Sequence, residues 1–304
     1  MEYNLRRARP IPSGALKDTI SYEIRQIASM RGEFVDVGGS RLYYYAAGTR
    51  GAGHPVVLIH GFPMTSRLWH DFIRDFAPGH RQIIVDLPGF GRSDPPSAAR
   101  AGCGAHAAAI HALLDDLGVD QAYIIGHGLG GGVAQAFAIQ WPTRVAGLAL
   151  VSSAGFGVKP RRLARFARAL GPLARHTPPA LLAGLVHGSV RRGFADPERA
   201  HLTLDTCLRH FTTHAGRDAL AAHLAVMRHC DTTAWSRRLG ELHVPAAVVW
   251  GADDPFYPVS LGARLHEAIA GSSFTVISGA SHYVPEDQPD ALRRALEPLL
   301  ATHA

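Results

Sequence analysis

The sequence predicts an α/β fold in which a mostly parallel, twisted sheet carries helices on both faces. Short continuous apolar runs, such as PVVLIH at 55–60 and RQIIVDL at 81–87, are typical of strands buried on both faces. Amphipathic segments separate these runs, and this alternation favours a parallel sheet with right-handed connections. A length of 304 residues is sufficient for one such domain with an insertion.

The expected elements follow one another in a regular order. Residues 16–30 predict a helix within an N-terminal helical extension, 1–32, and the pair Gly38–Gly39 predicts the turn of a hairpin between 33 and 48. The core then alternates between strand and helix. Its further strands are expected at 55–60, 81–87, 121–127 and 144–153, and its helices at 66–77, 105–118 and 129–141.

The alternation stops after the sixth strand. From 157 to 239 the pattern is helical without a clear strand, and a buried strand resumes at 244–251. We therefore predict a helical cap at 157–239, inserted into a core that is formed by 33–156 and 240–304. The last expected elements are a helix at 260–270, a strand at 272–278 and a helix at 289–301.

The composition argues against nucleic-acid binding, membrane insertion and secretion. The formal net charge is +6, but the arginines are spread along predicted helices, so nucleic acid is not expected as a partner. No apolar run approaches the roughly 20 residues that span a bilayer, and residues 1–14 lack the apolar centre of a signal peptide. We expect a cytoplasmic monomer or homodimer without membrane contacts that acts on a small-molecule substrate.

Neither a metal nor a cofactor is expected. The three cysteines are far apart and show no C-x-x-C spacing, which argues against a disulfide framework or a cysteine metal site. The many histidines form no H-E-x-x-H pair or similar helical pattern.

Residues 124–135, IIGHGLGGGVAQ, have the pattern of a nucleophile elbow without its nucleophile. In the G-x-S-x-G elbow a strand turns sharply into a helix, and the central residue is the nucleophile. Gly126 and Gly130 match the outer glycines, but the central residue is Gly128. Because glycine has no side chain, no covalent intermediate can form at this position.

The other polar motifs also follow predicted strands. Ligands of open parallel sheets bind outside the carboxyl ends of the strands, so these loops are expected to meet at one edge. Along the chain the order is elbow, then acid, then histidine. The loops are HGFP at 60–63, DLPGFGRSD at 86–94, GADDP at 251–255 and GASHY at 279–283.

These motifs resemble the landmarks of the α/β-hydrolase family. HGFP, DLPGFGRSD, GHGLGG, WGADDP and GASHYVPEDQP occur in the order that the family shows, and the resemblance covers the chain from Glu33 onward. It is nearest to epoxide hydrolases, haloalkane dehalogenases and carbon–carbon-bond hydrolases with helical caps. The resemblance implies an α/β-hydrolase fold, and the cap is its least specific part.

The resemblance also implies roles for individual residues. His282 is expected to be the base and Asp254 its orienting acid; Asp254 matches better than Asp253 because the family's acid commonly precedes the proline. The backbone N–H groups of Phe62 and Leu129 are expected to form the oxyanion hole, where such donors contribute about 3 kcal/mol each.

The neighbouring polar residues are expected to be structural. His60 and Pro63 would shape the turn after the first parallel strand, and His127 would pack beside the elbow. Asp86 and Ser93 would hold their loop in place. Two further serines, Ser152 and Ser153, end another strand, but nothing in the sequence places them against the base.

The cap is expected to set specificity. Phe166, Phe211 and Met227 are predicted to line a hydrophobic substrate pocket. The segment 157–239 contains no tyrosine, whereas epoxide hydrolases of the family hold the epoxide oxygen with cap tyrosines. Dehalogenases require a carboxylate nucleophile, which is missing as well. Four cap histidines could also reach the pocket: His187, His210, His214 and His223.

Three interpretations of Gly128 stay open. The glycine is natural, and His282 with Asp254 deprotonates the substrate or a water directly. Alternatively, the protein only binds a ligand on an enzyme fold. In the third interpretation, the chain is an ordinary serine hydrolase inactivated at this position. We favour an enzyme acting on a small, fairly apolar carbonyl compound without a covalent serine intermediate: a lyase, cyclase, isomerase or direct-water hydrolase.

Overall fold

The computed structural model describes residues 32–48, 51, 53–95, 102–170, 173–229 and 232–301. The helix predicted at 16–30, and with it nearly all of the N-terminal extension, lies outside the described residues. Among the described helices, none has the length and apolar character that crossing a membrane requires.

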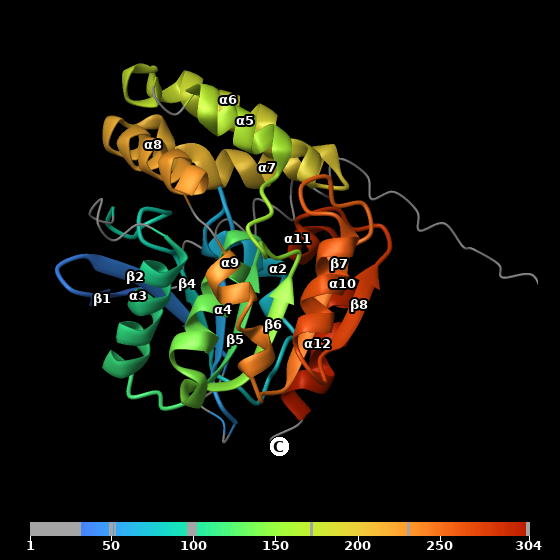
Figure 1. The fold of residues 1–304 in the computed structure, drawn as a ribbon. Helices are drawn as coiled ribbons and strands as arrows, with labels where there is room; N and C mark the ends of the chain where they lie inside the picture. Colours follow the sequence, from blue (N-terminus) through green and yellow to red (C-terminus); the bar gives the residue numbers. More distant parts are fainter. Residues whose placement is uncertain are drawn as a thin grey trace, which may run out of the picture. The chain divides into compact units, whose positions relative to one another are not determined.

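The core is an eight-stranded, mostly parallel sheet with packed helices, which confirms the predicted fold class (Figure 1). Its strand order is β1-β2-β4-β3-β5-β6-β7-β8, and only the pairs β1–β2 and β2–β4 are antiparallel. The strands are β1 (Glu33–Asp36), β2 (Arg41–Ala47), β3 (Val56–Ile59), β4 (Gln82–Val85), β5 (Ala122–His127), β6 (Val145–Val151), β7 (Ala246–Gly251) and β8 (Ser273–Ile277).

The central strands owe their position to their continuous apolar sequences. All four side chains of β3, VVLI, are fully buried, and β3 lies parallel to both β4 and β5. Because β3 to β8 run in the same direction, their carboxyl ends meet at one edge of the sheet. The loops that carry the predicted site residues leave the sheet at this edge.

The helices of the core follow the predicted alternation with one exception. The segment predicted as a helix at 66–77 is a 3₁₀ turn, η1 (Ser66–Trp69), followed by the single-turn helix α2 (His70–Ile73). All eight residues of this segment are buried, so it has no solvent-facing side of the kind that an amphipathic helix presents. The other core helices are α3 (Cys103–Asp116), α4 (Leu129–Gln140), α10 (Val259–Ala268), α11 (Val284–Asp287) and α12 (Pro289–Leu300).

A group of helices between β6 and β7 covers one end of the core (Figure 1). In the described part of 157–239 every regular element is a helix, so this segment has the helical character that its sequence predicts. The main helices are α5 (Arg161–Leu170), α6 (Pro179–Val190), α7 (Pro197–Leu208), α8 (His214–His229) and α9 (Thr233–Ser236), with short turns η4 (Ala174–His176), η5 (Arg191–Gly193) and η6 (Arg209–Thr212) between them.

A buried ion cluster ties the cap to the core. Arg199 of α7 bonds to Asp71 of α2 and donates to Glu286 of α11, with an Nε–Oε2 distance of 3.1 Å. Arg67 lies 3.7 Å from the other oxygen of Glu286, whose side chain is only 1% exposed. Burial raises the pKa of the Glu286 carboxyl, and the two arginines oppose this shift. The cluster also explains why charged residues of the 66–73 segment are buried.

Removing the cap's contribution to this cluster is expected to destabilise the protein. Breaking a buried ion pair costs about 3–5 kcal/mol, and the partial exposure of Arg199 reduces this to roughly 2 kcal/mol for Arg199→Ala. Urea unfolding measures the change. The matched control is Arg238→Ala, which removes a solvent-exposed pair with Glu241 and should leave the urea unfolding midpoint almost unchanged. Equal losses in both variants would contradict a stabilising role for the cluster.

Candidate active site

The elbow has the backbone conformation that its sequence pattern predicts. Gly128 stands between β5 and α4 with φ +54° and ψ −118°, a region that glycine occupies without the penalty a side chain brings. Its N–H donates to the carbonyl of Val151, and its own carbonyl accepts from the N–H groups of Gly131 and Ala154. Neighbouring main-chain groups therefore fix the turn even though residue 128 has no side chain.

His282 and Asp254 form the predicted hydrogen-bonded pair. His282 Nδ1 lies 2.8 Å from Asp254 Oδ2. The second oxygen, Oδ1, accepts from the N–H groups of Phe256 at 2.8 Å and Tyr257 at 3.0 Å, so the buried carboxylate is held at both oxygens. This arrangement makes Nδ1 the donor and leaves the lone pair on Nε2. Asp253, the alternative acid, is exposed.

The Nε2 atom of His282 faces the elbow glycine. A Cβ atom built on Gly128 would lie 3.3 Å from His282 Nε2 and 3.6 Å from the Cα of Gly61. The base therefore stands beside the position from which a nucleophilic side chain would project. Because Gly128 supplies none, Nε2 is in reach of a reactant bound at that position.

Two buried histidines support the site and are uncharged. His127 Nε2 donates to the carbonyl of His282 at 3.0 Å, and burial holds the pKa of His127 well below its ordinary value. His60 Nε2 accepts from the N–H of Leu87 and its Nδ1 lies 3.0 Å from the carbonyl of Gly61; burial lowers its pKa to about 4. Both rings thus fix main-chain segments at the strand ends.

Asp86 and Ser93 hold the loop after β4. The carboxylate of Asp86 accepts from the N–H groups of Ser66 at 2.7 Å and Arg92 at 2.9 Å. The hydroxyl of Ser93 donates to the Asp86 carbonyl at 2.6 Å. These bonds connect the loop to the segment that follows Phe62.

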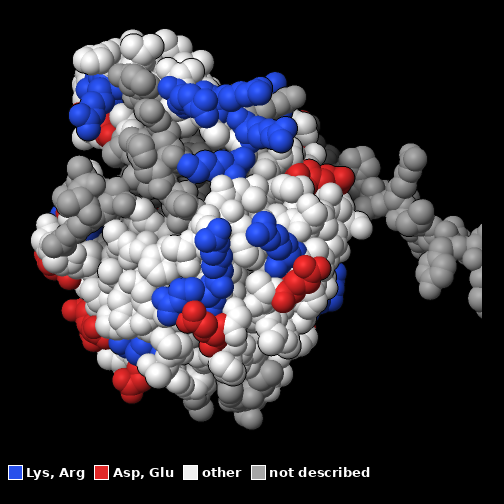
Figure 2. Space-filling view, viewed as in Figure 1, with Lys and Arg blue, Asp and Glu red and all other residues white. Residues whose placement is uncertain are grey.

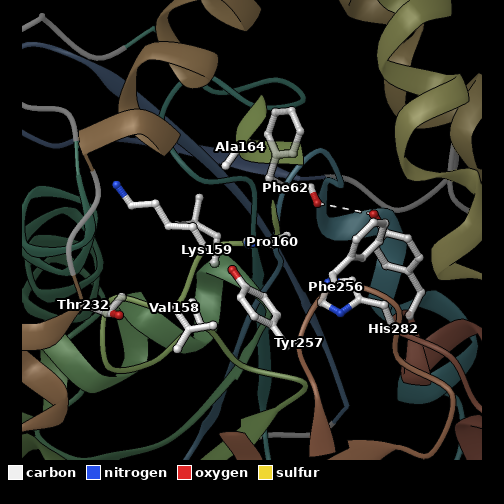
Figure 3. A pocket seen from close by; sticks show the side chains of 12 residues that line it. Phe62, Val158, Lys159, Pro160, Ala164, Thr232, Phe256, Tyr257 and His282 are labelled. Atoms are coloured by element: carbon white, nitrogen blue, oxygen red, sulfur yellow. Dashed lines mark hydrogen bonds between the residues drawn. The ribbon is translucent and has the colours of Figure 1, made fainter. Parts of the chain in front are cut away.

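A small, mainly apolar cavity of about 60 Å³ adjoins His282 (Figure 3). The predicted oxyanion residues Phe62 and Leu129 both line it. The hydroxyl of Tyr283, which burial keeps protonated by raising its pKa well above its usual value, donates to the Phe62 carbonyl at 3.4 Å. The other lining residues are Ala154, Val158, Lys159, Pro160, Ala164, Thr232, Phe256 and Tyr257.

The described lining residues include no serine, cysteine or carboxylate. The Oγ1 of Thr232, which is among them, accepts from the N–H of Gly157. Ser152 and Ser153 are fully buried and do not line the cavity. The hydroxyl of Ser153 donates to the Ala154 carbonyl at 2.8 Å.

The predicted cap residues do not form this cavity. Phe211 is completely buried and packs with Phe90, and Phe166 is partly buried; neither is among the residues that line this cavity. The side chain of Met227 lies outside the described set.

Most of the residues that line the cavity were not predicted from the sequence. Three of them adjoin the predicted base and acid: Phe256, Tyr257 and Tyr283. Because they lie within three residues of Asp254 or His282 in the sequence, their position beside the cavity could have been predicted. Three others, residues 158–160, come from the irregular connection between β6 and α5, where neither periodicity nor a motif marks them. The cavity is not lined by three of the four cap histidines, His187, His214 and His223. The side chain of His210 is not described.

Comparisons with known proteins agree with this geometry. The family described as "alpha/beta hydrolase fold" matches residues 54–289. The chain is 27% identical to the 2-hydroxy-6-oxononadienedioate/2-hydroxy-6-oxononatrienedioate hydrolase of Klebsiella pneumoniae, over 88% of this chain and 94% of that protein. It is 25% identical to the 2-hydroxy-6-oxo-6-phenylhexa-2,4-dienoate hydrolase of Comamonas testosteroni, over 85% and 91% of the two chains.

A solved structure of another protein has a similar fold. The thermophilic esterase from Thermogutta terrifontis superposes with a TM-score of 0.75 and 27% identity, and the alignment covers 90% of this chain and all of the esterase. The match of the family pattern extends over most of the chain and includes the elbow, the acid and the histidine. The chain therefore belongs to the α/β-hydrolase family.

Proposed function

We propose that the protein is a direct-water hydrolase of small keto compounds in which His282, oriented by Asp254, is the general base. The observation that supports this proposal is the position of His282 Nε2, 3.3 Å from where a Cβ of residue 128 would lie. A base in that place can deprotonate a water molecule bound above Gly128. Among the reaction classes that the sequence leaves open, hydrolysis is the one that the named relatives share.

The proposed reaction needs no covalent intermediate. His282 takes a proton from water while the water oxygen bonds to the carbonyl carbon of the substrate. The N–H groups of Phe62 and Leu129 stabilise the resulting oxyanion. When the carbonyl reforms, the bond between the carbonyl carbon and its neighbouring carbon breaks, the departing carbon takes the electron pair, and His282 returns the proton to it. One water is consumed, and the acid and the second carbon product are released.

The substrate class follows from the surroundings of the cavity. The cavity itself is lined mostly by apolar groups, whereas an adjacent groove of about 640 Å³ is lined by Lys159, Arg161 and Arg192. Figure 2 shows several Lys and Arg side chains on the cap, in the upper part of the view. The positive charge that lines this groove attracts anions. We therefore propose an enolic keto acid of the 2-hydroxy-6-oxodienoate type, the class named for the relatives. Such a compound reacts as its 2-keto tautomer, formed when the 2-hydroxyl proton moves to the carbon beside the 6-carbonyl. That carbon is then saturated, and the electron pair that it takes on cleavage is delocalised onto the 2-keto oxygen.

The test is a direct assay of the unmodified protein. We expect it to consume 2-hydroxy-6-oxo-6-phenylhexa-2,4-dienoate, followed by loss of the conjugated chromophore, and to leave p-nitrophenyl acetate intact. Intact-protein mass spectrometry during turnover should show no acyl adduct. The matched control is His243→Ala, which removes an exposed histidine ahead of β7 and should retain full turnover.

Two outcomes would contradict the proposal. An acyl adduct, or ester hydrolysis by the unmodified chain, would mean that another side chain provides a nucleophile. Binding of dienoates without any turnover would instead support the alternative, a ligand-binding protein on a hydrolase fold.

A further inference from the structure

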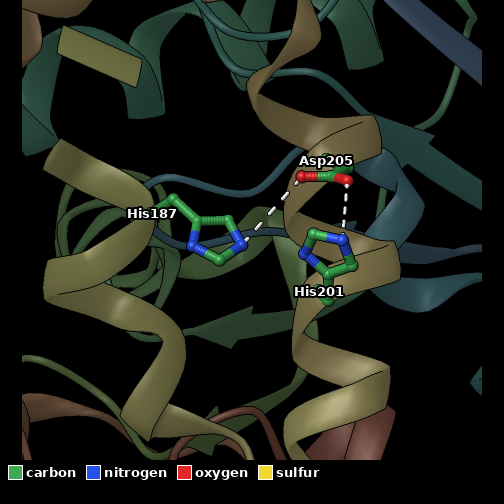
Figure 4. Close-up of side chains that lie close together, drawn as sticks. All are labelled: His187, His201 and Asp205. Atoms are coloured by element: carbon green, nitrogen blue, oxygen red, sulfur yellow. Dashed lines mark ion pairs between the residues drawn. The ribbon is translucent and has the colours of Figure 1, made fainter. Parts of the chain in front are cut away.

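Three side chains suitable for binding a metal meet on the cap between α6 and α7 (Figure 4). His187 comes from the last turn of α6. His201 and Asp205 lie four residues apart on α7, so they share one face of that helix. None of the three lines the cavity beside His282, which makes this cluster a separate feature of the molecule.

The ligand atoms are close to the spacing that a tetrahedral ion requires. His187 Nε2 lies 4.0 Å from Asp205 Oδ1, and His201 Nε2 lies 3.5 Å from Asp205 Oδ2. One ligand atom from each residue falls within a common distance of 4.8 Å. Bonds of about 2.0–2.1 Å around tetrahedral zinc place ligand atoms roughly 3.3 Å apart. Small side-chain rotations would close the remaining gap.

His187 is prepared for this role by its surroundings. Its Nε2 atom is buried and has no hydrogen-bond partner within the described residues. A buried polar nitrogen without a partner is unusual in a folded protein, and a bound ion would satisfy it.

Ions can reach the cluster from solvent. His187 and His201 line two grooves, of about 460 Å³ and 410 Å³, and Asp205 lines the first of these. The exposed positions of His201 and Asp205 leave room for a water ligand. An ordinary surface ion pair would account for His201 and Asp205 alone, but it does not account for the buried Nε2 of His187 aimed at the same carboxylate.

We propose that His187, His201 and Asp205 bind one divalent transition-metal ion of the zinc class, with water as the fourth ligand. Two imidazoles and one carboxylate suit zinc, cobalt or nickel, whereas magnesium and calcium prefer oxygen ligands alone. The ion would link α6 to α7. Because α6 leads into η5, whose Gly193 carbonyl accepts from the Tyr283 N–H at 3.0 Å, the linked helices adjoin the loop that carries His282.

Cobalt titration of the full-length, tag-free chain tests the proposal. We expect one equivalent of Co²⁺ to bind at pH 7.5 with visible absorption bands of tetrahedral type, and Zn²⁺ to displace it. His187→Ala and Asp205→Asn should each weaken binding by at least about tenfold, since even the loss of outer-shell partners costs about 10–100-fold. Mg²⁺ should not compete. His243→Ala is the matched control and should bind as the unmodified chain does.

The variants also distinguish metal binding at this cluster from metal binding at other histidines of the chain. Circular dichroism confirms that each variant is folded, and Zn²⁺ should raise the melting temperature of the unmodified chain but not that of Asp205→Asn. Unchanged affinity in both His187→Ala and Asp205→Asn would overturn the proposal, and so would the absence of binding to the unmodified chain. In either case the cluster would be a surface ion pair only.

Discussion

Asp254→Asn is expected to slow the chemical step of dienoate hydrolysis by roughly 10³–10⁴-fold, the loss found when the acid of a histidine–acid pair is neutralised. Oδ1 of Asp254 accepts two main-chain N–H bonds, so the asparagine oxygen should keep that position. The new NH₂ group then faces His282 Nδ1 and donates to it. His282 must carry its proton on Nε2 instead, where it can no longer act as a base.

Single-turnover kinetics measures this loss, and Asp253→Asn is its control. Asp253 is the neighbouring carboxylate, but it is exposed, and His282 bonds to Asp254 instead. We expect Asp253→Asn to retain the rate within about twofold and Asp254→Asn to bind substrate with little change. Comparable losses in both variants would show that the charge of the loop matters and not the hydrogen bond to His282.

Gly128→Ser is expected to create an esterase. The Cβ of the new serine would lie 3.3 Å from Nε2 of His282, which is paired with Asp254, and the proposed oxyanion donors Phe62 and Leu129 line the adjoining cavity. We expect hydrolysis of p-nitrophenyl acetate with a transient acyl adduct, neither of which the unmodified chain should show. Dienoate turnover should fall, because the serine occupies the proposed water position. The variant should also lose about 1–3 kcal/mol of stability, since serine is strained at φ +54°.

The variant Gly128→Ala distinguishes the effect of the serine hydroxyl from the effect of adding a Cβ atom. Alanine brings the same backbone strain and the same Cβ contact with His282, so its stability loss should match that of serine. It should impair dienoate turnover and give no esterase. A folded Gly128→Ser protein without ester hydrolysis would mean that the oxyanion donors or the base are out of position, and the direct-water proposal would lose its basis.

The sheet and the His282–Asp254 hydrogen bond were predictable because short stretches of sequence indicate them. The run VVLI of β3 has no polar side and can only be a buried strand, which the structure shows. The pair His282–Asp254 was expected from the resemblance of its motifs to the α/β-hydrolase family, in which the acid commonly precedes a proline, as Asp254 does and Asp253 does not. Parallel strands bring such motifs to one edge of a sheet whatever lies between them in sequence.

The remaining errors concern contacts between distant segments. The segment 66–77 has the spacing of an amphipathic helix, but Arg199, more than a hundred residues later, meets Asp71 and buries its polar side. Periodicity places Phe211 on an apolar face without saying that the face packs in the interior. The possible metal ligands were missed for the same reason: His201 and Asp205 have helical spacing, but their partner His187 lies on another helix.

The size of the cavity has a kinetic consequence. At about 60 Å³ it is far smaller than the roughly 300 Å³ or more of typical small-molecule sites. Val158, Lys159 and Phe256 line both the cavity and the basic groove outside it, so they separate the two. Under the proposed function, a dienoate is larger than this cavity, so these three side chains must move aside before it reaches His282 and again before its products leave. Movement of these side chains, and not proton transfer, can then be the rate-limiting step of steady-state turnover.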